Sequence, residues 1–289
     1  MAILQCENIT YLYSVGTPFE TAAVKDISFL CEKGEIIGVI GHTGSGKSTL
    51  IQHLNGLLEP SSGKVYLNGN DIWSKENRKN IRRVRFAVGL CFQYPEYQIF
   101  EETVFKEIAF GPSQMGLDEA EIEKRVFESM DYVGLSRELE KKSPFDLSGG
   151  QKRRVAIASI IAMKPEVLIL DEPCAGLDPK GRDRILNLIT EYQKQEGNTV
   201  IFVSHSMEDI AKISSRVLVL NKGSVAMYGK VSEVFSRAAE LKEIGLNIPE
   251  ITEVFLKLRE MGIDCRCDIY SLEHAEKEFN RLSALKGGN

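Results

Sequence analysis

The chain has 289 residues, of which 43% are hydrophobic and 27% charged, and its formal net charge is −5. This composition is typical of soluble globular proteins, and it gives no overall positive field that would attract nucleic acid. The first residues lack the layout of a secretory signal, and no apolar run reaches the roughly 20 residues that span a bilayer. We therefore expect any role at a membrane to come through a partner.

The first part of the sequence predicts strands around one helix. Residues 1–35 alternate apolar and polar side chains, which predicts antiparallel strands joined by a loop at Gly16 and Pro18. The run EIIGVIG, residues 35–41, is apolar and predicts a buried central strand. After it, SGKSTLIQHLNGLLEP has helical periodicity and is expected to end near Pro60, before an edge hairpin in SGKVYLNGNDI.

The middle of the sequence alternates helices with buried strands. Residues 118–135 place Ile122, Val126 and Met130 on one face at steps of four, which predicts an amphipathic helix. Strands that alternate with helices build a parallel sheet covered on both faces, so we expect an α/β core. The later segments that read as buried strands are 166–173, 198–205 and 215–223.

The last part of the sequence predicts a small helical extension. Strands become sparse after about residue 225, and two segments have apolar residues at helical spacing. We therefore expect two regions, 1–230 and 231–289. The apolar positions at helical spacing in the extension are Ile251, Val254, Phe255, Leu258, Leu272, Ala275, Phe279 and Leu282.

A glycine-rich loop, GHTGSGKST, lies between the buried strand and the helix and matches the P-loop pattern. Glycines let backbone N–H groups surround phosphates, and the helix presents its positive end to them. Lys47 is a point charge for the β- and γ-phosphates, and Ser48 offers a hydroxyl to Mg²⁺. The residues expected to bind nucleotide here are Gly41, His42, Thr43, Gly44, Ser45, Gly46, Lys47, Ser48 and Thr49.

Acidic residues follow the strand at 166–173. Asp171 and Glu172 come at its carboxyl end, where open α/β sheets bind ligands. Asp171 is expected to hold the Mg²⁺ shell and Glu172 to polarise an attacking water. His205 ends the next buried strand, and we expect it near the same phosphate because parallel strands end at one edge of the sheet. A structural, hydrogen-bonded role for His205 is the alternative.

The segment DLSGGQKRR, residues 146–154, is a second loop suited to a phosphate, although one nucleotide does not need two such loops. Its adjacent glycines expose N–H groups ahead of another helix. The basic run 152–154 fits either a role at that site or a solvated face of the helix.

Together these motifs resemble the ATP-binding cassette (ABC) ATPases over about residues 1–230. LSGGQ at 147–151, the signature loop, is identical to the family's signature, and the motifs occur in the family's order. The resemblance implies an α/β fold with a RecA-like P-loop core, an antiparallel β-subdomain and a helical signature subdomain at about 95–160. It also implies that two cassettes pair head to tail, so that each signature loop closes over the partner's ATP.

The resemblance assigns roles to further residues. Gln93 would bind Mg²⁺ together with Ser48 and Asp171, and Asp178 would lie at the seam of the dimer. Adenine would stack on an aromatic ring, for which Tyr13 is the candidate and Tyr11 the rival; alternatively, Tyr13 only packs on the β-subdomain. The signature residues that would bind the partner's γ-phosphate are Ser148, Gly149, Gly150 and Gln151.

The stretch FQYPEYQIF, residues 92–100, resembles the Q-loop of energy-coupling factor (ECF) transporter ATPases, a group that includes cobalt-importer cassettes. DEPCAGLDPKGR and YSVGTPFE resemble the second, A′, type. The resemblance implies a second, usually non-identical cassette, a transmembrane T component and a substrate-binding S component, with this chain at the cytoplasmic face of the cell membrane. Hydrolysis would power uptake of a vitamin or a transition metal ion, and residues 231–289 would support dimer contacts.

The aromatic and apolar residues of this Q-loop have two interpretations. They either receive a coupling helix of the T component or fill the core of the helical subdomain. Two other functions stay open: a cassette of another importer, and a soluble ABC ATPase that acts on DNA or ribosomes. A single cassette, no heptad array and an acidic balance disfavour the last. The residues concerned are Tyr94, Tyr97, Ile99 and Phe100.

Overall fold

The structure, a computed structural model, describes residues 2–266 and 268–286 and is built around a six-stranded sheet. Its strand order is β10-β9-β3-β8-β7-β6; β10 is antiparallel to β9, and the other neighbours are parallel. Every residue of β3, β7 and β8 is buried, which confirms the three apolar strands expected from the sequence. The bounds are β3 Ile36–Gly41, β6 Val88–Cys91, β7 Val167–Asp171, β8 Thr199–Val203, β9 Arg216–Asn221 and β10 Ser224–Lys230.

The register of this sheet brings the ends of its central strands together. Val203 at the end of β8 pairs with Asp171 on one side and with Val39 on the other. Because all three strands run parallel, the segments that follow them leave from the same edge. The edge therefore collects the P-loop after β3, Glu172 after β7 and His205 after β8.

A second, antiparallel sheet has the order β2-β1-β4-β5. Its strands are β1 Ala2–Tyr13, β2 Thr21–Glu32, β4 Ser62–Leu67 and β5 Asn70–Asp71. The N-terminal strands and the edge hairpin are thus confirmed. One apolar cluster joins the two sheets, with Ile9 and Ile27 packed among residues that include Val39 and Ile201 of the larger sheet. This packing fixes Tyr13, at the end of β1, relative to the P-loop.

The helix after the P-loop, α1 (Lys47–Leu54), is shorter than expected. It was predicted to end near Pro60, and that end is wrong. Asn55 caps the helix, and Gly56 adopts a left-handed φ of 70° with its N–H bonded to the carbonyl of His53. Such a glycine ends a helix without steric cost, so local backbone geometry stops α1 before the proline.

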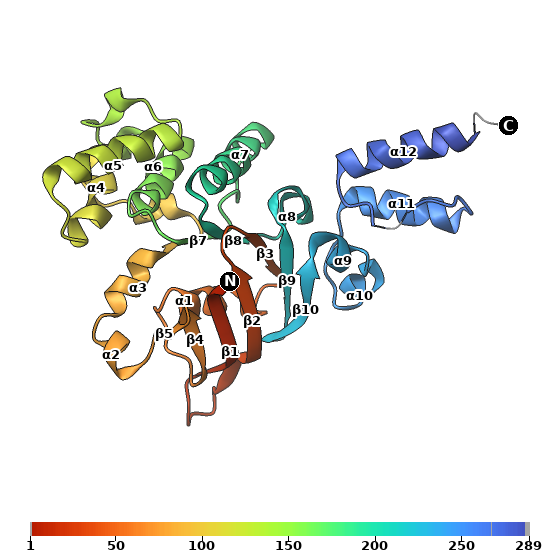
Figure 1. Cartoon of the computed structure of the whole chain (residues 1–289), viewed down its shortest axis with the longest axis horizontal. Coiled ribbons are helices and arrows are strands. Elements are labelled where there is room, and N and C mark those ends of the chain that lie inside the picture. Colours follow the sequence, from red (N-terminus) through yellow and green to blue (C-terminus); the bar gives the residue numbers. More distant parts are fainter. Residues whose placement is uncertain (1, 267, 287–289) are drawn as a thin grey trace.

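The helices α4, α5 and α6 lie together at one end of the molecule (Figure 1), and their buried side chains belong to the same apolar cluster as the parallel sheet. The helix predicted at 118–135 is confirmed as α5, with Val126 and Met130 buried, and Asp118 caps its first turn. Pro95–Gln98 forms a short 3-10 helix, η1, and two further 3-10 helices are η2 (Arg137–Leu139) and η3 (Pro144–Asp146). The helices are α2 Lys75–Arg78, α3 Ile81–Ala87, α4 Val104–Gln114, α5 Glu119–Tyr132 and α6 Gly149–Ile161.

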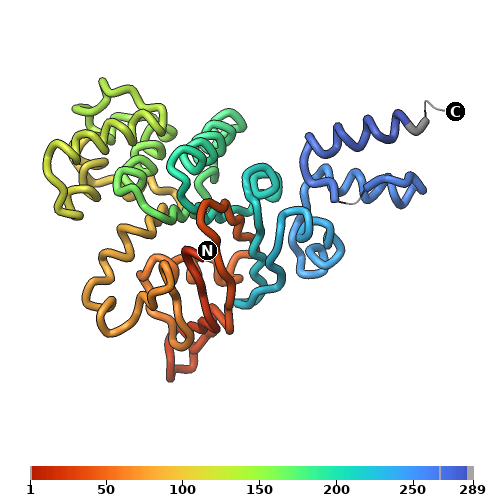
Figure 2. The backbone as a smooth tube through the Cα atoms, in the orientation of Figure 1, coloured from red at the N-terminus to blue at the C-terminus, as the bar shows by residue number. Residues whose placement is uncertain are grey.

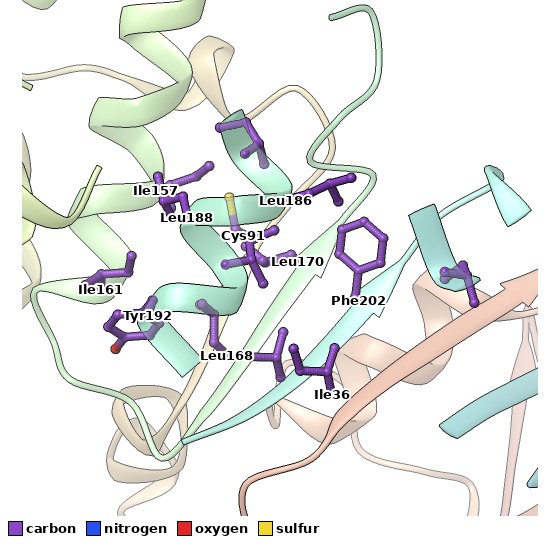
Figure 3. Packing of buried hydrophobic residues seen from close by; sticks show 14 of the residues in the cluster. Ile36, Cys91, Ile157, Ile161, Leu168, Leu170, Leu186, Leu188, Tyr192 and Phe202 are labelled. Carbon is purple, nitrogen blue, oxygen red and sulfur yellow. The ribbon is translucent and has the colours of Figure 1, made fainter. Parts of the chain in front are cut away.

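Two helices, α6 and α7 (Pro179–Glu196), cover one face of the parallel sheet. Figure 3 shows Ile157 and Ile161 of α6 and Leu188 and Tyr192 of α7 gathered over the β7 residue Leu168 and its neighbours. These side chains belong to one buried cluster, so a movement of α6 is resisted by direct packing on β7. The next helix, α8 (Met207–Ile213), follows β8.

The C-terminal helices are α9 Val231–Phe235, α10 Ala238–Glu243, α11 Glu250–Glu260 and α12 Leu272–Lys286. Side chains of α9 and α10 belong to the cluster of the parallel sheet, whereas Phe255, Cys265, Ile269 and Ala275 form a small core of their own. Figures 1 and 2 show α11 and α12 projecting from the sheets on the side opposite α4 and α5. Residues 287–289 of the expected extension lie outside the described residues.

Part of the apolar face expected in α11 and α12 is exposed. Val254 is 45% exposed, Leu272 78% and Phe279 45%, so these apolar side chains are only partly covered within the described residues. The ring of Phe279 still contacts that of Phe255, with 5.1 Å between centroids, so its exposed part is the side that faces away from α11. The periodicity identified apolar positions correctly, but it did not show which of them would be covered.

Candidate functional site

The P-loop connects β3 to α1 by a tight backbone path. Gly46 has a φ of 99°, and a Cβ atom there would lie 2.5 Å from the carbonyl oxygen of Ala23. Another residue would therefore be strained and would collide with β2. The loop is held against the antiparallel sheet, and this contact fixes the direction of its backbone N–H groups.

Lys47, the first residue of α1, folds back over this loop. Its ammonium donates hydrogen bonds to the carbonyl oxygens of Gly41, at 2.6 Å, and His42, at 3.0 Å. Burial lowers the pKa of Lys47, while the nearby carboxylates of Glu172 and Asp171 oppose that shift. The ammonium is thus already positioned beside the loop, where a phosphate would find a positive charge.

The acidic side of the site comes from β7. Asp171 is buried, and burial raises its pKa, although Lys47 and a hydrogen bond from Ser48 act in the opposite direction. Asp171 and Ser48 therefore lie together, as oxygen ligands of a hard cation must. This pair, with the hydroxyl at the start of α1, fits a Mg²⁺ ion.

Glu172 follows Asp171 in a strained backbone conformation, with a φ of 50°. The pKa of its carboxyl group is raised to about 7, mainly by burial and also by the negative charge of Asp171, although contacts with His205 and Lys47 act in the opposite direction. Its buried oxygen Oε1 has no hydrogen-bond partner among the described residues. A carboxylate with a pKa near 7 and a free oxygen suits proton transfer at neutral pH.

His205 follows β8 and faces Glu172. Its Nε2 atom lies 3.4 Å from Glu172 Oε1, and half of its side chain is exposed. Burial lowers the pKa of His205, and the positive charge of Lys47 and the nearby His42 lower it further. The imidazole is therefore neutral at pH 7 and has a donor as well as an acceptor for a ligand.

A cavity of about 400 Å³ joins these groups. Its volume lies within the range of small-molecule sites. Tyr13 lines it and its hydroxyl is 3.3 Å from Thr49 Oγ1, whereas Tyr11 packs against the ring of His53 instead. The expected residues that line this cavity are Tyr13, Thr43, Gly44, Gly46, Lys47, Ser48, Thr49, Gln93, Asp171, Glu172 and His205.

Some expected P-loop residues do not line the cavity. Gly41 and Ser45 are buried in the frame of the loop. His42 turns away, and its Nε2 lies 2.8 Å from the carbonyl oxygen of Ile244 at the end of α10. The P-loop is thus linked directly to the C-terminal helices.

The signature loop lines a second hollow, of about 660 Å³, formed with the start of α7. Ser148 caps α6, and Gln151 completes a reciprocal capping box with it. Because these hydrogen bonds fix the first turn of α6, the signature loop keeps its shape without a ligand and stays exposed. The expected residues at this hollow are Ser148, Gly150, Gln151 and Asp178; Gly149 is exposed beside them.

The positive charge of the second hollow was predicted only in part, since a role at this site was one interpretation of the basic run 152–154, whereas Lys180 and Arg184 were not expected there. Arg154, Lys180 and Arg184 line it, and none of these three takes part in an ion pair among the described residues. Burial lowers the pKa of Arg154, and the positive charge of Arg184 lowers it further. The sequence showed these basic residues, but their spacing gave no signal that residues 30 positions apart would share one surface. Uncompensated cations indicate a surface that receives an anion.

Comparisons with known proteins identify this arrangement. The family model described as ABC transporter matches residues 24–175. The chain belongs to the ABC transporter family. A protein of Caldanaerobacter subterraneus named energy-coupling factor transporter ATP-binding protein EcfA2 is 54% identical over 278 residues, which cover 96% of each chain. A protein of the same name from Clostridioides difficile is 54% identical over 283 residues, 97% of this chain and 98% of the relative.

Solved cassettes have the same fold. CbiO1 of Clostridium perfringens, described as part of an ABC transporter complex, has a TM-score of 0.74 and 38% identity, over 88% of this chain and 98% of that one. A dimeric cassette in a post-hydrolysis state with ADP and Pi has a TM-score of 0.71 and 26% identity, over 79% and 98%. The expected α/β ABC fold is confirmed, and the cassette is an ATP-binding ATPase of the ECF transporter group.

The Q-loop residues of the cassette divide between the two interpretations. Ile99 is buried in the main core, which contradicts an interfacial role for it. Tyr97 is 84% exposed and Phe100 59%, and Tyr94 is exposed as well. Phe100 packs edge-on against Phe110 of α4, with 5.0 Å between ring centroids, beside a mainly apolar hollow of about 280 Å³. In the part of the chain that the structure describes, no helix has the length and hydropathy of a membrane span.

Proposed function

We propose that this cassette hydrolyses ATP to power uptake of a vitamin or a transition metal ion through the T and S components of an ECF-type importer. It would work with a second, non-identical cassette at the cytoplasmic face of the cell membrane. The observation that supports this most strongly is the pair of hollows. One gathers the groups of this chain that suit the phosphates, the cation and the attacking water. The other has a preformed loop and cations that form no ion pair among the described residues, without the carboxylates of the first.

The chemistry that we propose for the first cavity follows from its charges. Lys47 and the N–H groups of the P-loop bind the phosphates, and the ring of Tyr13 stacks on the base. Ser48, Asp171 and Gln93 would hold Mg²⁺, which would neutralise developing charge on the phosphate oxygens. Glu172 polarises the attacking water through its free oxygen, and the neutral imidazole of His205 hydrogen-bonds the γ-phosphate and that water.

The second hollow completes the site of the paired cassette in this proposal. Ser148 and the backbone of Gly149 and Gly150 bind the partner's γ-phosphate, and Asp178 lies at the seam. ATP then holds the dimer together, because it contacts both chains. After hydrolysis those contacts are lost and the dimer loosens, which gives an alternation that a membrane partner can use.

Docking of the T component is proposed at the apolar hollow beside η1 and α4. Phe100 lines this hollow, and Tyr97 of the adjoining η1 exposes its ring. A helix placed in a groove of this kind is anchored by such side chains. The exposed apolar residues of α11 and α12, such as Val254 and Phe279, are the surface that we propose for contact with the second cassette.

The experiment that tests this function is co-purification from native membranes, with identification of the partners. We expect a second cassette and a polytopic membrane protein. Tyr97→Ala combined with Phe100→Ala should weaken binding of the membrane partner by a few kcal/mol and so lower its recovery with the cassette. The ATP affinity of the purified chain should stay unchanged. Phe19→Ala, which removes an aromatic ring that is 82% exposed on another surface, is the matched control. Normal assembly of the folded double variant would contradict this docking site.

A further inference from the structure

Arg153 is a buried cation in the first turns of α6, immediately after the signature loop. It is only 4% exposed. Its Nε and Nη2 atoms donate to the two carboxylate oxygens of Glu96, at 3.0 and 2.6 Å. Its Nη1 atom donates to the carbonyl oxygens of Pro173, at 3.2 Å, and Ala175, at 2.6 Å. Of the two interpretations of the basic run 152–154, a solvated face is therefore excluded at this residue.

These four hydrogen bonds join three segments that are distant in the sequence. Glu96 belongs to η1 in the Q-loop, next to the apolar hollow. Pro173 and Ala175 belong to the catalytic turn, residues 172–178, which runs from Glu172 to Asp178. Arg153 itself moves with α6, whose first residues form the signature loop.

The contacts with the catalytic turn lie directly beside Glu172. Pro173 is its neighbour in the chain, and the N–H of Ala175 donates to the carbonyl oxygen of Glu172 at 3.1 Å. The backbone at Glu172 is strained, with its φ of 50°, so contacts with its surroundings must hold it in place. A shift of the Arg153 guanidinium would therefore displace the turn that carries the carboxylate.

The chemistry of arginine suits this position. A guanidinium has five donors in a rigid plane, so it can bind a carboxylate along one edge and carbonyl oxygens along another. A lysine has one compact ammonium group and cannot span both sides. Burial would raise the pKa of Glu96, but the hydrogen bonds from Arg153 outweigh it and the pKa lies below its ordinary value. The pair is therefore charged, and each buried charge depends on the other.

We propose that Arg153 is a positioning residue that transmits a displacement of the Q-loop to the signature loop and to Glu172 together. Its guanidinium makes these three segments move as one body, so occupancy of the apolar hollow changes hydrolysis at this chain's own site and closure over the partner's site in the same step. That the T component occupies the apolar hollow rests on the proposed function. The connection from Arg153 to Glu172 through the hydrogen bonds to Pro173 and Ala175 does not.

The test compares three single variants in the assembled cassettes, with and without the membrane partner. Arg153→Lys keeps the charge but loses the planar fork. Glu96→Asp keeps the negative charge but shortens the side chain by one methylene group, which withdraws the carboxylate from the guanidinium and loosens the link to η1. Arg137→Lys is the matched control, because Arg137 forms an arginine–carboxylate pair with Asp131 in which both side chains are more than half exposed, 59% and 55%. ATPase kcat, KM and thermal unfolding are measured for each.

We expect Arg153→Lys to lower kcat by roughly 10- to 100-fold, the scale of a misplaced reacting group, at an unchanged KM for ATP. Glu96→Asp leaves the contacts with Pro173 and Ala175 in place, so kcat without the membrane partner should stay within about threefold of the parent. The change in ATPase rate on adding the membrane partner should disappear in Glu96→Asp. The Arg137→Lys control should match the parent in all three measurements.

Two results would overturn the proposal. One is a folded Arg153→Lys cassette with the parent's kcat and the parent's response to the membrane partner. The other is a loss in which kcat, ATP affinity and unfolding temperature fall together, since a purely structural residue acts in that way. If no membrane partner is recovered from native membranes, the function proposed above fails, but the kcat and KM of Arg153→Lys still decide the link to Glu172.

Discussion

The P-loop and the signature loop are both glycine-rich turns ahead of a helix, yet their surroundings differ. The P-loop lies between two sheets, with Lys47 bonded to its carbonyl oxygens and two carboxylates beside it. The signature loop lies at the surface, and cations line its hollow together with Asp178. A phosphate at the first loop would meet charges of both signs, and one at the second would meet mainly positive charge.

This difference shows that an anion-binding turn becomes a catalytic site only through its neighbours. The side chains suited to proton transfer, Glu172 and His205, and the carboxylate suited to bind a cation, Asp171, lie at the ends of β7 and β8. These strands end beside the P-loop and not beside the signature loop. The signature loop has binding groups alone, so it suits the closing half of a site whose chemistry belongs to another chain. Variants that act on one loop and spare the other test this view.

The largest effect is expected at Glu172. Glu172→Gln removes the proton acceptor of the first cavity and keeps its shape, so turnover should fall by roughly 10²–10⁴ while ATP still binds. Retained binding should be visible as an ATP-stabilised dimer in size-exclusion chromatography. A turnover within a few-fold of the parent would show that another group polarises the water.

The next effect separates the two loops. Ser148→Arg places a long charged side chain on the signature loop, so closure over the partner's ATP should be blocked while this chain's own ATP affinity stays nearly intact. Lys47→Ala is the complementary variant and should lose ATP at this chain's own P-loop. Nucleotide trapping that distinguishes the two sites of the pair measures both. Loss at this chain's own P-loop in Ser148→Arg would contradict head-to-tail pairing.

A smaller effect concerns pH and the stability of the nucleotide-free protein. Burial raises the pKa of Glu172 from 4.5 to about 7, so the folded state binds this proton more tightly than the unfolded state. The resulting stabilisation is complete below pH 4.5 and is lost as the pH rises to 7. Glu172→Gln should therefore raise the free energy of unfolding relative to the parent at pH 8, by at most about 3 kcal/mol, and much less at pH 5. Urea unfolding at both pH values measures it, and an equal difference at both would contradict the raised pKa.

The smallest effect is expected at the base. Tyr13→Ala should weaken ATP binding roughly tenfold, since stacking of a base on an aromatic ring is worth about 1–3 kcal/mol. Tyr13→Phe keeps the ring and loses only the contact of the hydroxyl with Thr49, so it should bind as the parent does. Titration calorimetry of the two variants distinguishes stacking from mere packing of Tyr13. Equal affinities of Tyr13→Ala and the parent would favour packing.

The sequence by itself determined the features that depend on short spacings. The P-loop pattern, the apolar strands and the acidic end of β7 are local, and the rule that parallel strands end at one edge was sufficient to predict that Lys47, Glu172 and His205 would meet. The tertiary structure decided the features that depend on distant partners. Arg153 is buried because Glu96 and the catalytic turn come from elsewhere in the chain, and Ile99 is core whereas Tyr97 is exposed. Leu272 is exposed although it shares the helical spacing of the buried Ala275. A sequence pattern shows which side chains need a neighbour, but the neighbour is supplied by packing between segments that are far apart in the chain.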